Sequence, residues 1–215
     1  RMSDSAKFKA FLSYSRKDEE AVRRLHRRLE SYEIPRALRK NGQARLGRFF
    51  RDKDELGARS ELGAELHNKV ASAEWLILCC SPHSAASQWV GTELDSFITT
   101  HGYDRVLAVI LDGEPHDVFP PSLREREPLA ADFRKIGDGE DLGFLKLVAG
   151  LLGVDLGELR DRQAAAERAR TRNRAILAGV FGVLAVAASV SAVIAVQQRD
   201  RAEAMTLEAI DIGAG

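Results

Sequence analysis

The feature that most constrains this chain is an uncharged apolar run near its C-terminal end, residues 175–196, AILAGVFGVLAVAASVSAVIAV. As an α-helix this run would extend about 33 Å, which is enough to cross a hydrocarbon core of about 30 Å. A buried helix of a soluble domain is the alternative, but such a helix usually carries one polar face, and this run has none. The run therefore predicts a transmembrane helix.

Arginine is concentrated on the N-terminal side of this run. Six arginines lie between Arg160 and Arg174, whereas only Arg199 and Arg201 follow the run closely. The positive-inside rule therefore places the N-terminal side in the cytoplasm. The first residues also lack the apolar core of a cleavable signal peptide. We expect a single-pass protein of the cytoplasmic (inner) membrane, with its N-terminal domain in the cytoplasm.

The N-terminal part of the chain alternates short apolar runs with amphipathic stretches. The runs 75–80 and 106–111 are almost wholly apolar, as expected for central strands that are covered on both faces. The predicted strands are 9–13, 48–50, 75–80, 106–111 and 129–133. Helices are predicted at 18–32, from Ser60 to about Ala73, at 87–100 and at 141–152. This alternation predicts a flavodoxin-like, doubly wound α/β fold with a five-stranded, mainly parallel sheet, in which ligands bind beyond the carboxyl ends of the strands.

The predicted strand ends lack the motifs of three common functions. The turn after the first strand, SYSRKD at 13–18, contains no glycine and so cannot be a Rossmann GxGxxG loop. No GxxxxGK[ST] sequence occurs, which excludes a P-loop. The third strand ends in Cys80-Ser81-Pro82, where a phospho-accepting receiver domain would have an aspartate.

Charge and cysteine content narrow the class of protein further. The chain has 32 Lys+Arg and 32 Asp+Glu, so it lacks the basic excess of a dedicated nucleic-acid binder. The two cysteines, Cys79 and Cys80, are adjacent, which provides neither a disulfide framework nor metal-ligand spacing. We expect both thiols to be packed and inert, and we expect no bound metal and no nucleic-acid partner.

Three motifs that follow predicted strands resemble one known family. They are FLSYSRKD at 11–18, FFRDKDEL at 49–56 and the SxWxxxE pattern at 87–93. In this order and context they resemble the first box, the start of the BB loop and the helix-three motif of the Toll/interleukin-1 receptor (TIR) domain in its bacterial form. The resemblance covers about residues 8–155 and implies the TIR fold. An arginine-rich stretch and a single span after such a domain are also similar to membrane-tethered bacterial TIR proteins.

The resemblance implies an activity and a catalytic residue. Many TIR domains of this kind cleave NAD+ at the nicotinamide–ribose bond with a glutamate four residues after the motif tryptophan, which here is Glu93 after Trp89. One carboxylate can stabilise the oxocarbenium character that develops on the ribose, and nicotinamide leaves from a cationic nitrogen without a strong general acid. The alternative is that Trp89 packs locally and Glu93 is a solvated helix residue.

The resemblance also implies a set of substrate-binding residues. They are Tyr14, Ser15, Arg16, Phe50, Asp52 and Trp89. Arg16 is suited to contact a phosphate, and its alternative is a surface ion pair with Asp18 or Glu19. Phe50 would stack on a base or ribose, and its alternative is a place in the core. The charges of the loop 51–59 would serve contacts between TIR domains or would simply be solvated.

Taken together, these observations predict a membrane-tethered TIR domain in signalling or defence that hydrolyses NAD+ on self-association, with NAD+ as substrate and no cofactor. The alternative is a non-catalytic scaffold that binds other TIR domains through the loop 51–59, and a related base-exchange or cyclising activity is a third possibility. The expected segments are an N-terminal tail (1–7), the TIR domain (8–155), a basic juxtamembrane helix (156–174), the transmembrane helix (175–196) and the start of an extracytoplasmic segment that continues further (197–215).

Overall fold

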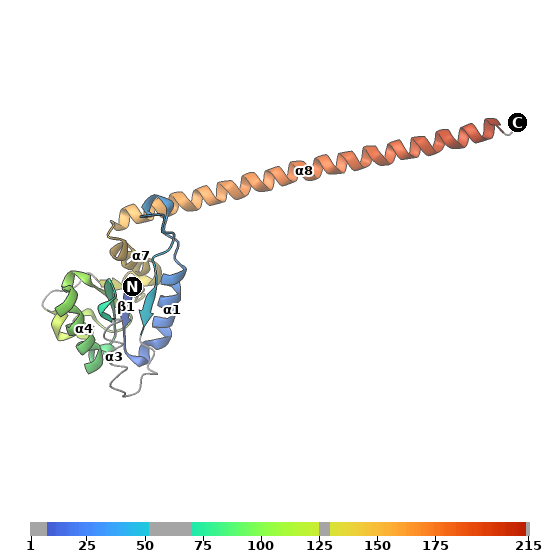
Figure 1. Ribbon diagram of the computed structural model, residues 1–215. Coiled ribbons are helices and arrows are strands. Elements are labelled where there is room, and N and C mark those ends of the chain that lie inside the picture. The colour runs from blue at the N-terminus through green and yellow to red at the C-terminus, as the bar shows by residue number, and fades with distance from the viewer. Residues whose placement is uncertain (1–7, 52–69, 125–129, 214–215) are drawn as a thin grey trace, which may run out of the picture. The chain divides into compact units, whose positions relative to one another are not determined.

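The computed structural model describes residues 8–51, 70–124 and 130–213, with side chains described up to residue 189 and at a few positions beyond. Within these residues, five strands form one parallel sheet in the order β2-β1-β3-β4-β5 (Figure 1). The strands are β1 (Ala10–Ser13), β2 (Phe49–Arg51), β3 (Trp75–Cys80), β4 (Val106–Ile110) and β5 (Ala130–Asp132). This is the flavodoxin-like strand order, so the predicted fold is confirmed.

The helices of the sheet-containing part also fall largely where the apolar spacing predicts them. The longer ones are α1 (Glu19–Ser31), α4 (Gln88–His101) and α7 (Gly139–Leu152). The predicted helix from Ser60 lies outside the described residues except for its last turn near Val70. Three further short helices are α3 (Pro82–Ala85), α5 (Pro115–Val118) and α6 (Pro121–Arg124), and three 3-10 turns are η1 (Arg16–Asp18), η2 (Arg36–Leu38) and η3 (Tyr103–Arg105).

The short helices follow from the positions of prolines. In the proline-containing segment after β4, Pro121 begins one helical turn. Each of the three short helices in fact begins at a proline, whose fixed φ and missing N–H suit the first helical position. The prolines that mark a loop in the sequence therefore also start helical turns here.

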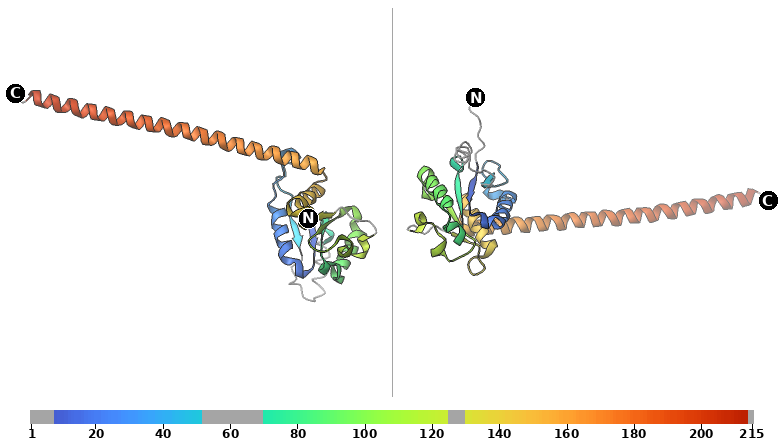
Figure 2. Two further views of the ribbon diagram at one scale, coloured as in Figure 1. Left: turned by 180° about the vertical axis from the view of Figure 1, so that it is seen from behind. Right: turned by 90° about the horizontal axis from the view of Figure 1, so that it is seen from below.

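Both faces of the sheet are covered, and alternate strand residues enter two separate cores. In the right-hand view of Figure 2 the green α4 lies on one side of the strands and the blue α1 on the other. Ala10, Leu12 and Cys79 pack with α1, α7 and the first turns of the last helix, whereas Phe11, Leu78 and Cys80 pack with α4, α5 and α6. This alternation follows from the period of two along a strand. Cys79 and Cys80 therefore lie on opposite faces of the sheet.

Both cysteines are fully buried, as predicted. Burial raises the pKa of the Cys79 thiol well above its ordinary value, and the neighbouring Cys80 and Asp18 raise it further. Burial also raises the pKa of Cys80 to about 12. Since the thiolate is the reactive form, neither residue is a nucleophile at neutral pH.

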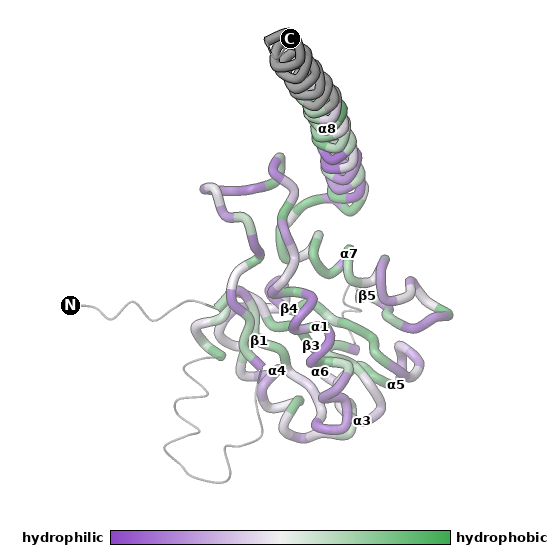
Figure 3. The backbone as a smooth tube through the Cα atoms, turned by 90° about the vertical axis from the view of Figure 1, so that its right-hand side faces the viewer, coloured by the Kyte–Doolittle hydropathy of each residue, from purple (hydrophilic) through white to green (hydrophobic). Residues whose placement is uncertain are grey.

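The last element, α8 (Leu156–Gly213), is one continuous helix. The chain divides into two units, residues 1–163 and 164–215, and Leu159 near the start of α8 is fully buried in the first unit. In the part of the chain with described side chains, one helical stretch, Leu156–Ser189, is long and apolar enough to cross a membrane. Figure 3 shows the change along α8 from hydrophilic to hydrophobic colours. The domain boundaries given above stay a prediction.

A glycine after β4 provides a test of how tightly the loops are packed. Gly113 has φ +83°, and a Cβ there would lie 2.5 Å from Val118 Cγ1 and 3.0 Å from the Pro82 ring. We expect Gly113→Ala to lower the free energy of unfolding by about 2–4 kcal/mol, because backbone strain and overpacking add. Gly102 has the same φ but nothing within 4 Å of its Cβ position, so Gly102→Ala measures the strain alone. Urea unfolding of the solubilised chain, followed by tryptophan fluorescence, checks this, and equal losses in both variants would contradict it.

An ion-pair network joins the ends of β4 and β5. Arg134 donates to both carboxylate oxygens of Asp132, from Nε at 2.9 Å and from Nη2 at 2.7 Å, and its Nη1 donates to the Gly113 carbonyl at 2.7 Å. The Arg134 side chain is 13% exposed and that of Asp132 is 17% exposed, so this pair is largely shielded from solvent. The network therefore ties together two loops at the carboxyl edge of the sheet.

This network predicts a pH dependence of stability. Hydrogen bonds from Arg134 lower the pKa of Asp132 below its ordinary 3.8. The stability that the ionised carboxylate contributes is thus present above that value and is lost as the pH falls through the lower, folded pKa. We expect Asp132→Asn to have a lower free energy of unfolding than the wild type at neutral pH. This difference should shrink as the pH falls below 3.8. Urea unfolding at a series of pH values checks this, with the exposed Asp141 replaced by Asn as the control. A difference that does not depend on pH would contradict it.

Candidate functional site

The predicted site lies at the carboxyl edge of β1, where α4 crosses the strand end. Ser13 is the last residue of β1, and its backbone pairs with Leu78 of β3. The β2 strand lies on the other side of β1, with Leu12 opposite Arg51. Because these three strands are parallel, their carboxyl ends meet at one edge. The loop after β1 and the end of β2 at Arg51 are thereby brought together.

Glu93 is held at this edge by hydrogen bonds to both of its carboxylate oxygens. Ser13 Oγ donates to Oε2 at 2.5 Å, and Trp89 Nε1 donates to Oε1 at 2.6 Å. Trp89 and Glu93 lie one helical turn apart on α4, which puts their side chains side by side. Trp89 is 55% exposed, whereas Ser13 is 1% exposed. The carboxylate therefore lies between a buried strand end and an exposed indole.

The start of α4 explains why Glu93 points this way. Ser87 caps the helix by accepting a hydrogen bond from the Val90 backbone N–H at 3.4 Å. Val90 and Leu94 are fully buried against the sheet and fix the rotation of the helix. Glu93 precedes Leu94 and is half-buried at the border of this packed face.

A second hydrogen bond across the edge joins the loop after β1 to the loop after β3. Ser81 Oγ donates to Asp18 Oδ2 at 2.6 Å and accepts from the backbone N–H groups of His83 and Ser84. Ser81 is the N-cap of α3, and Asp18 immediately precedes α1. The starts of two helices are thus tied together beside the candidate site.

The predicted substrate-binding residues after β1 occupy the loop that this bond restrains. Tyr14 and Ser15 are half-buried, and Arg16 is exposed in the turn η1. Asp18 and Glu19, which were the alternative ion-pair partners for Arg16, each contact another residue. Asp18 accepts a hydrogen bond from Ser81, and Glu19 Oε1 lies 3.7 Å from Arg51 Nη1.

Phe50 lies in an aromatic cluster on the face of the sheet that α4 covers. Its ring stacks on Phe11 with centroids 5.6 Å apart and contacts Phe8 at 5.4 Å. The structure therefore gives Phe50 the core contacts of the alternative interpretation, while the residue stays half-buried. Asp52 and the rest of the loop to residue 59 lie outside the described residues.

Two residues at this edge were not predicted as site residues from the sequence. Ser13 is the last residue of the predicted strand 9–13 and the first residue of the SYSRKD sequence. Arg51, in the FFRDKDEL motif, has a side chain that is only 12% exposed and lies near Glu19. Each of the two residues lies in one of the three sequence motifs, and this position could have identified it as a candidate site residue.

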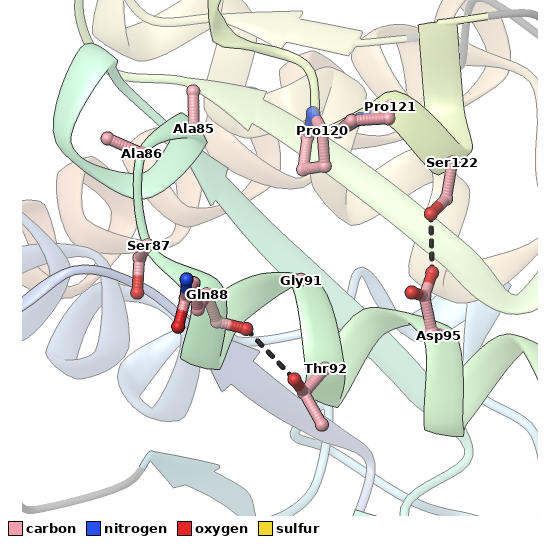
Figure 4. Close-up of a pocket in the computed structure, with 10 residues that line it drawn as sticks. All are labelled: Ala85, Ala86, Ser87, Gln88, Gly91, Thr92, Asp95, Pro120, Pro121 and Ser122. Carbon is pink, nitrogen blue, oxygen red and sulfur yellow. Dashed lines mark hydrogen bonds between the residues drawn. The ribbon is translucent and has the colours of Figure 1, made fainter.

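A separate groove lies on another side of α4. Its volume is about 500 Å³, and Figure 4 shows the residues that line it. They are Ala85, Ala86, Ser87, Gln88, Gly91, Thr92, Asp95, Pro120, Pro121 and Ser122. Ser122 Oγ donates to Asp95 Oδ1 across it. Neither Glu93 nor Trp89 lines this groove, so it is distinct from the predicted site.

Comparison with known proteins shows to which family this chain belongs. Residues 10–148 match the TIR domain. One relative, the NAD(+) hydrolase ApTIR of an Actinoplanes strain, is 31% identical over 113 residues, which are 50% of this chain and 14% of the relative. The chain thus matches only a small part of that relative's length. Since the family match includes well over half of the chain, this protein belongs to the TIR domain family.

Proposed function

We propose that this chain is a membrane-tethered NAD+ hydrolase whose TIR domain breaks the nicotinamide–ribose bond when several copies associate. The observation that carries the proposal is the placement of Glu93, whose two carboxylate oxygens accept from Ser13 and Trp89 at the carboxyl edge of the sheet. Membership of the TIR family and the similarity to an NAD(+) hydrolase support the choice of substrate.

The proposed chemistry uses Glu93 as an electrostatic stabiliser. As the bond between the nicotinamide nitrogen and C1′ of the ribose breaks, its electron pair goes to the nitrogen and neutralises the pyridinium, while positive charge develops on the ribose. A carboxylate already fixed in place opposes that charge without reorganising. Water then adds to C1′ and loses a proton to the solvent, which yields ADP-ribose and nicotinamide.

The remaining predicted residues would orient the dinucleotide. The exposed guanidinium of Arg16 suits the pyrophosphate, and Tyr14 and Ser15 would border the ribose. The exposed indole of Trp89 offers a face on which a base can stack beside Glu93. Phe50 and Asp52 are the remaining residues that the family resemblance assigns to substrate binding.

The membrane tether would raise the local concentration of the domain. The apolar part of α8 would span the inner membrane, and the arginines before it would keep the TIR domain in the cytoplasm. Tethered copies meet at an effective concentration far above that of the free protein, which favours association. Activity is therefore expected to depend on the surface density of the protein.

The test is nicotinamide release by the full chain reconstituted in liposomes at several protein-to-lipid ratios, measured by chromatography with mass analysis of the second product. We expect the rate per molecule to rise with density. Mass analysis separates hydrolysis from cyclisation and base exchange. No release from folded protein at high density would overturn the proposal and would favour a scaffold that binds other TIR domains through the loop 51–59.

A further inference from the structure

We infer that Ser13 is a positioning residue that fixes the carboxylate of Glu93 for the reaction; this inference rests on the proposed function. The two residues are 80 positions apart in the sequence, and their side chains meet because α4 packs across the end of β1. The inference concerns how the carboxylate is aimed, since Ser13 itself is buried and is not placed to touch the substrate.

The environment of Ser13 makes the interaction specific. The three residues before it, Ala10, Phe11 and Leu12, are fully buried and apolar, and Ser13 continues this strand at 1% exposure. A buried hydroxyl needs a hydrogen-bond partner, and an ionised carboxylate only accepts, so Ser13 must be the donor. The other fully buried polar side chains among the described residues are Ser81 and Ser84, whose hydroxyls donate to Asp18 and to the Ser81 carbonyl. The Ser13 hydroxyl donates to Glu93.

The two donors to Glu93 differ in rigidity. Trp89 belongs to the same helix as Glu93 and is more than half exposed. Ser13 belongs to a strand held by backbone pairing on both sides, with Leu78 directly opposite it. Ser13 therefore ties the carboxylate to the sheet, while Trp89 restrains it from the exposed side. Fixing both oxygens sets the plane of the carboxylate relative to the ribose.

The test compares Ser13→Ala with Ser84→Ala in the full chain reconstituted in liposomes. Both variants remove a buried, hydrogen-bonded hydroxyl, but that of Ser13 donates to Glu93, whereas that of Ser84 bonds to Ser81. We expect Ser13→Ala to lower kcat about 10- to 100-fold, the effect of losing one hydrogen bond to a charged group. The KM should change less than about 3-fold, since an aimed carboxylate acts mainly in the transition state. Ser13→Thr retains a hydroxyl and should restore most of kcat. A fall in kcat no larger than that of Ser84→Ala, or no rescue by threonine in a folded variant, would overturn the inference.

A second measurement does not depend on turnover. The chain has two tryptophans, so Trp75→Phe leaves Trp89 as the only indole reporter. In this background, Ser13→Ala should change the emission and acrylamide quenching of Trp89, because Glu93 is its hydrogen-bond partner, whereas Ser84→Ala should not. If the wild type releases no nicotinamide, the proposed function fails. The fluorescence then decides separately whether Ser13 positions Glu93, and an unchanged signal overturns it.

Discussion

Glu93→Gln is expected to lower nicotinamide release by about 10³-fold or more while the domain stays folded. The substitution keeps the size of the side chain and retains one oxygen that can accept from Ser13 or Trp89, whose donors now lie within 2.6 Å of the carboxylate. It removes the negative charge that stabilises the developing oxocarbenium ion. Loss of one preorganised neutral hydrogen-bond donor from an active site already lowers the rate about 10²–10³-fold, and loss of a full charge should cost at least as much.

The assay uses the full chain in liposomes, with urea unfolding to compare stability. Glu20→Gln is the matched control, because it removes a carboxylate from another helix, where Glu20 pairs only with exposed Arg24 among the contacts described here. We expect this control to retain wild-type activity. Turnover by Glu93→Gln close to that of the control would show that the reaction does not use this carboxylate.

Replacing Leu184 and Val186 together by arginine is expected to release the chain from the membrane. Both side chains are more than half exposed in the middle of the apolar run of α8. Each arginine at the centre of a spanning helix costs about 2.5–3.5 kcal/mol, so two shift the membrane partition by about 10⁴-fold. Nicotinamide release per molecule should then fall as well, because the copies are no longer concentrated on one surface.

The measurement is carbonate extraction of cell membranes followed by detection of the chain in the pellet and the supernatant. A control with Ala164→Arg and Ala165→Arg adds the same charge to the same helix before the apolar run, and it should remain in the membrane fraction. If the Leu184/Val186 variant stays in the pellet with the control, α8 does not anchor the chain through this run.

The order and type of most elements could be predicted from the sequence, since they depend on local patterns. The apolar run 75–80 became β3 with the same bounds, and the apolar spacing at 18–32 became α1. Hydrophobic periodicity reports whether a segment can bury one face or two, and this property hardly depends on the rest of the chain. The short helices α3, α5 and α6 escaped prediction because four residues carry no periodicity.

Phe50 illustrates where such reasoning ends. An aromatic residue at the end of a predicted strand has the same local sequence pattern whether it packs in the core or binds a ligand. The rings that contact Phe50, those of Phe8 and Phe11, lie in and just before β1. These contacts depend on the register in which β1 and β2 pair, which the local sequence does not give.

The sequence by itself determined the motifs, the carboxylate one turn after Trp89 and the apolar run of α8, because these features depend on spacing along the chain. Only the tertiary structure decided that Ser13 donates to Glu93 and that Asp18 accepts from Ser81. The physical reason is that parallel strands joined by crossover helices bring their carboxyl ends to one edge, so the contacts made there depend on strand order, register and helix packing together.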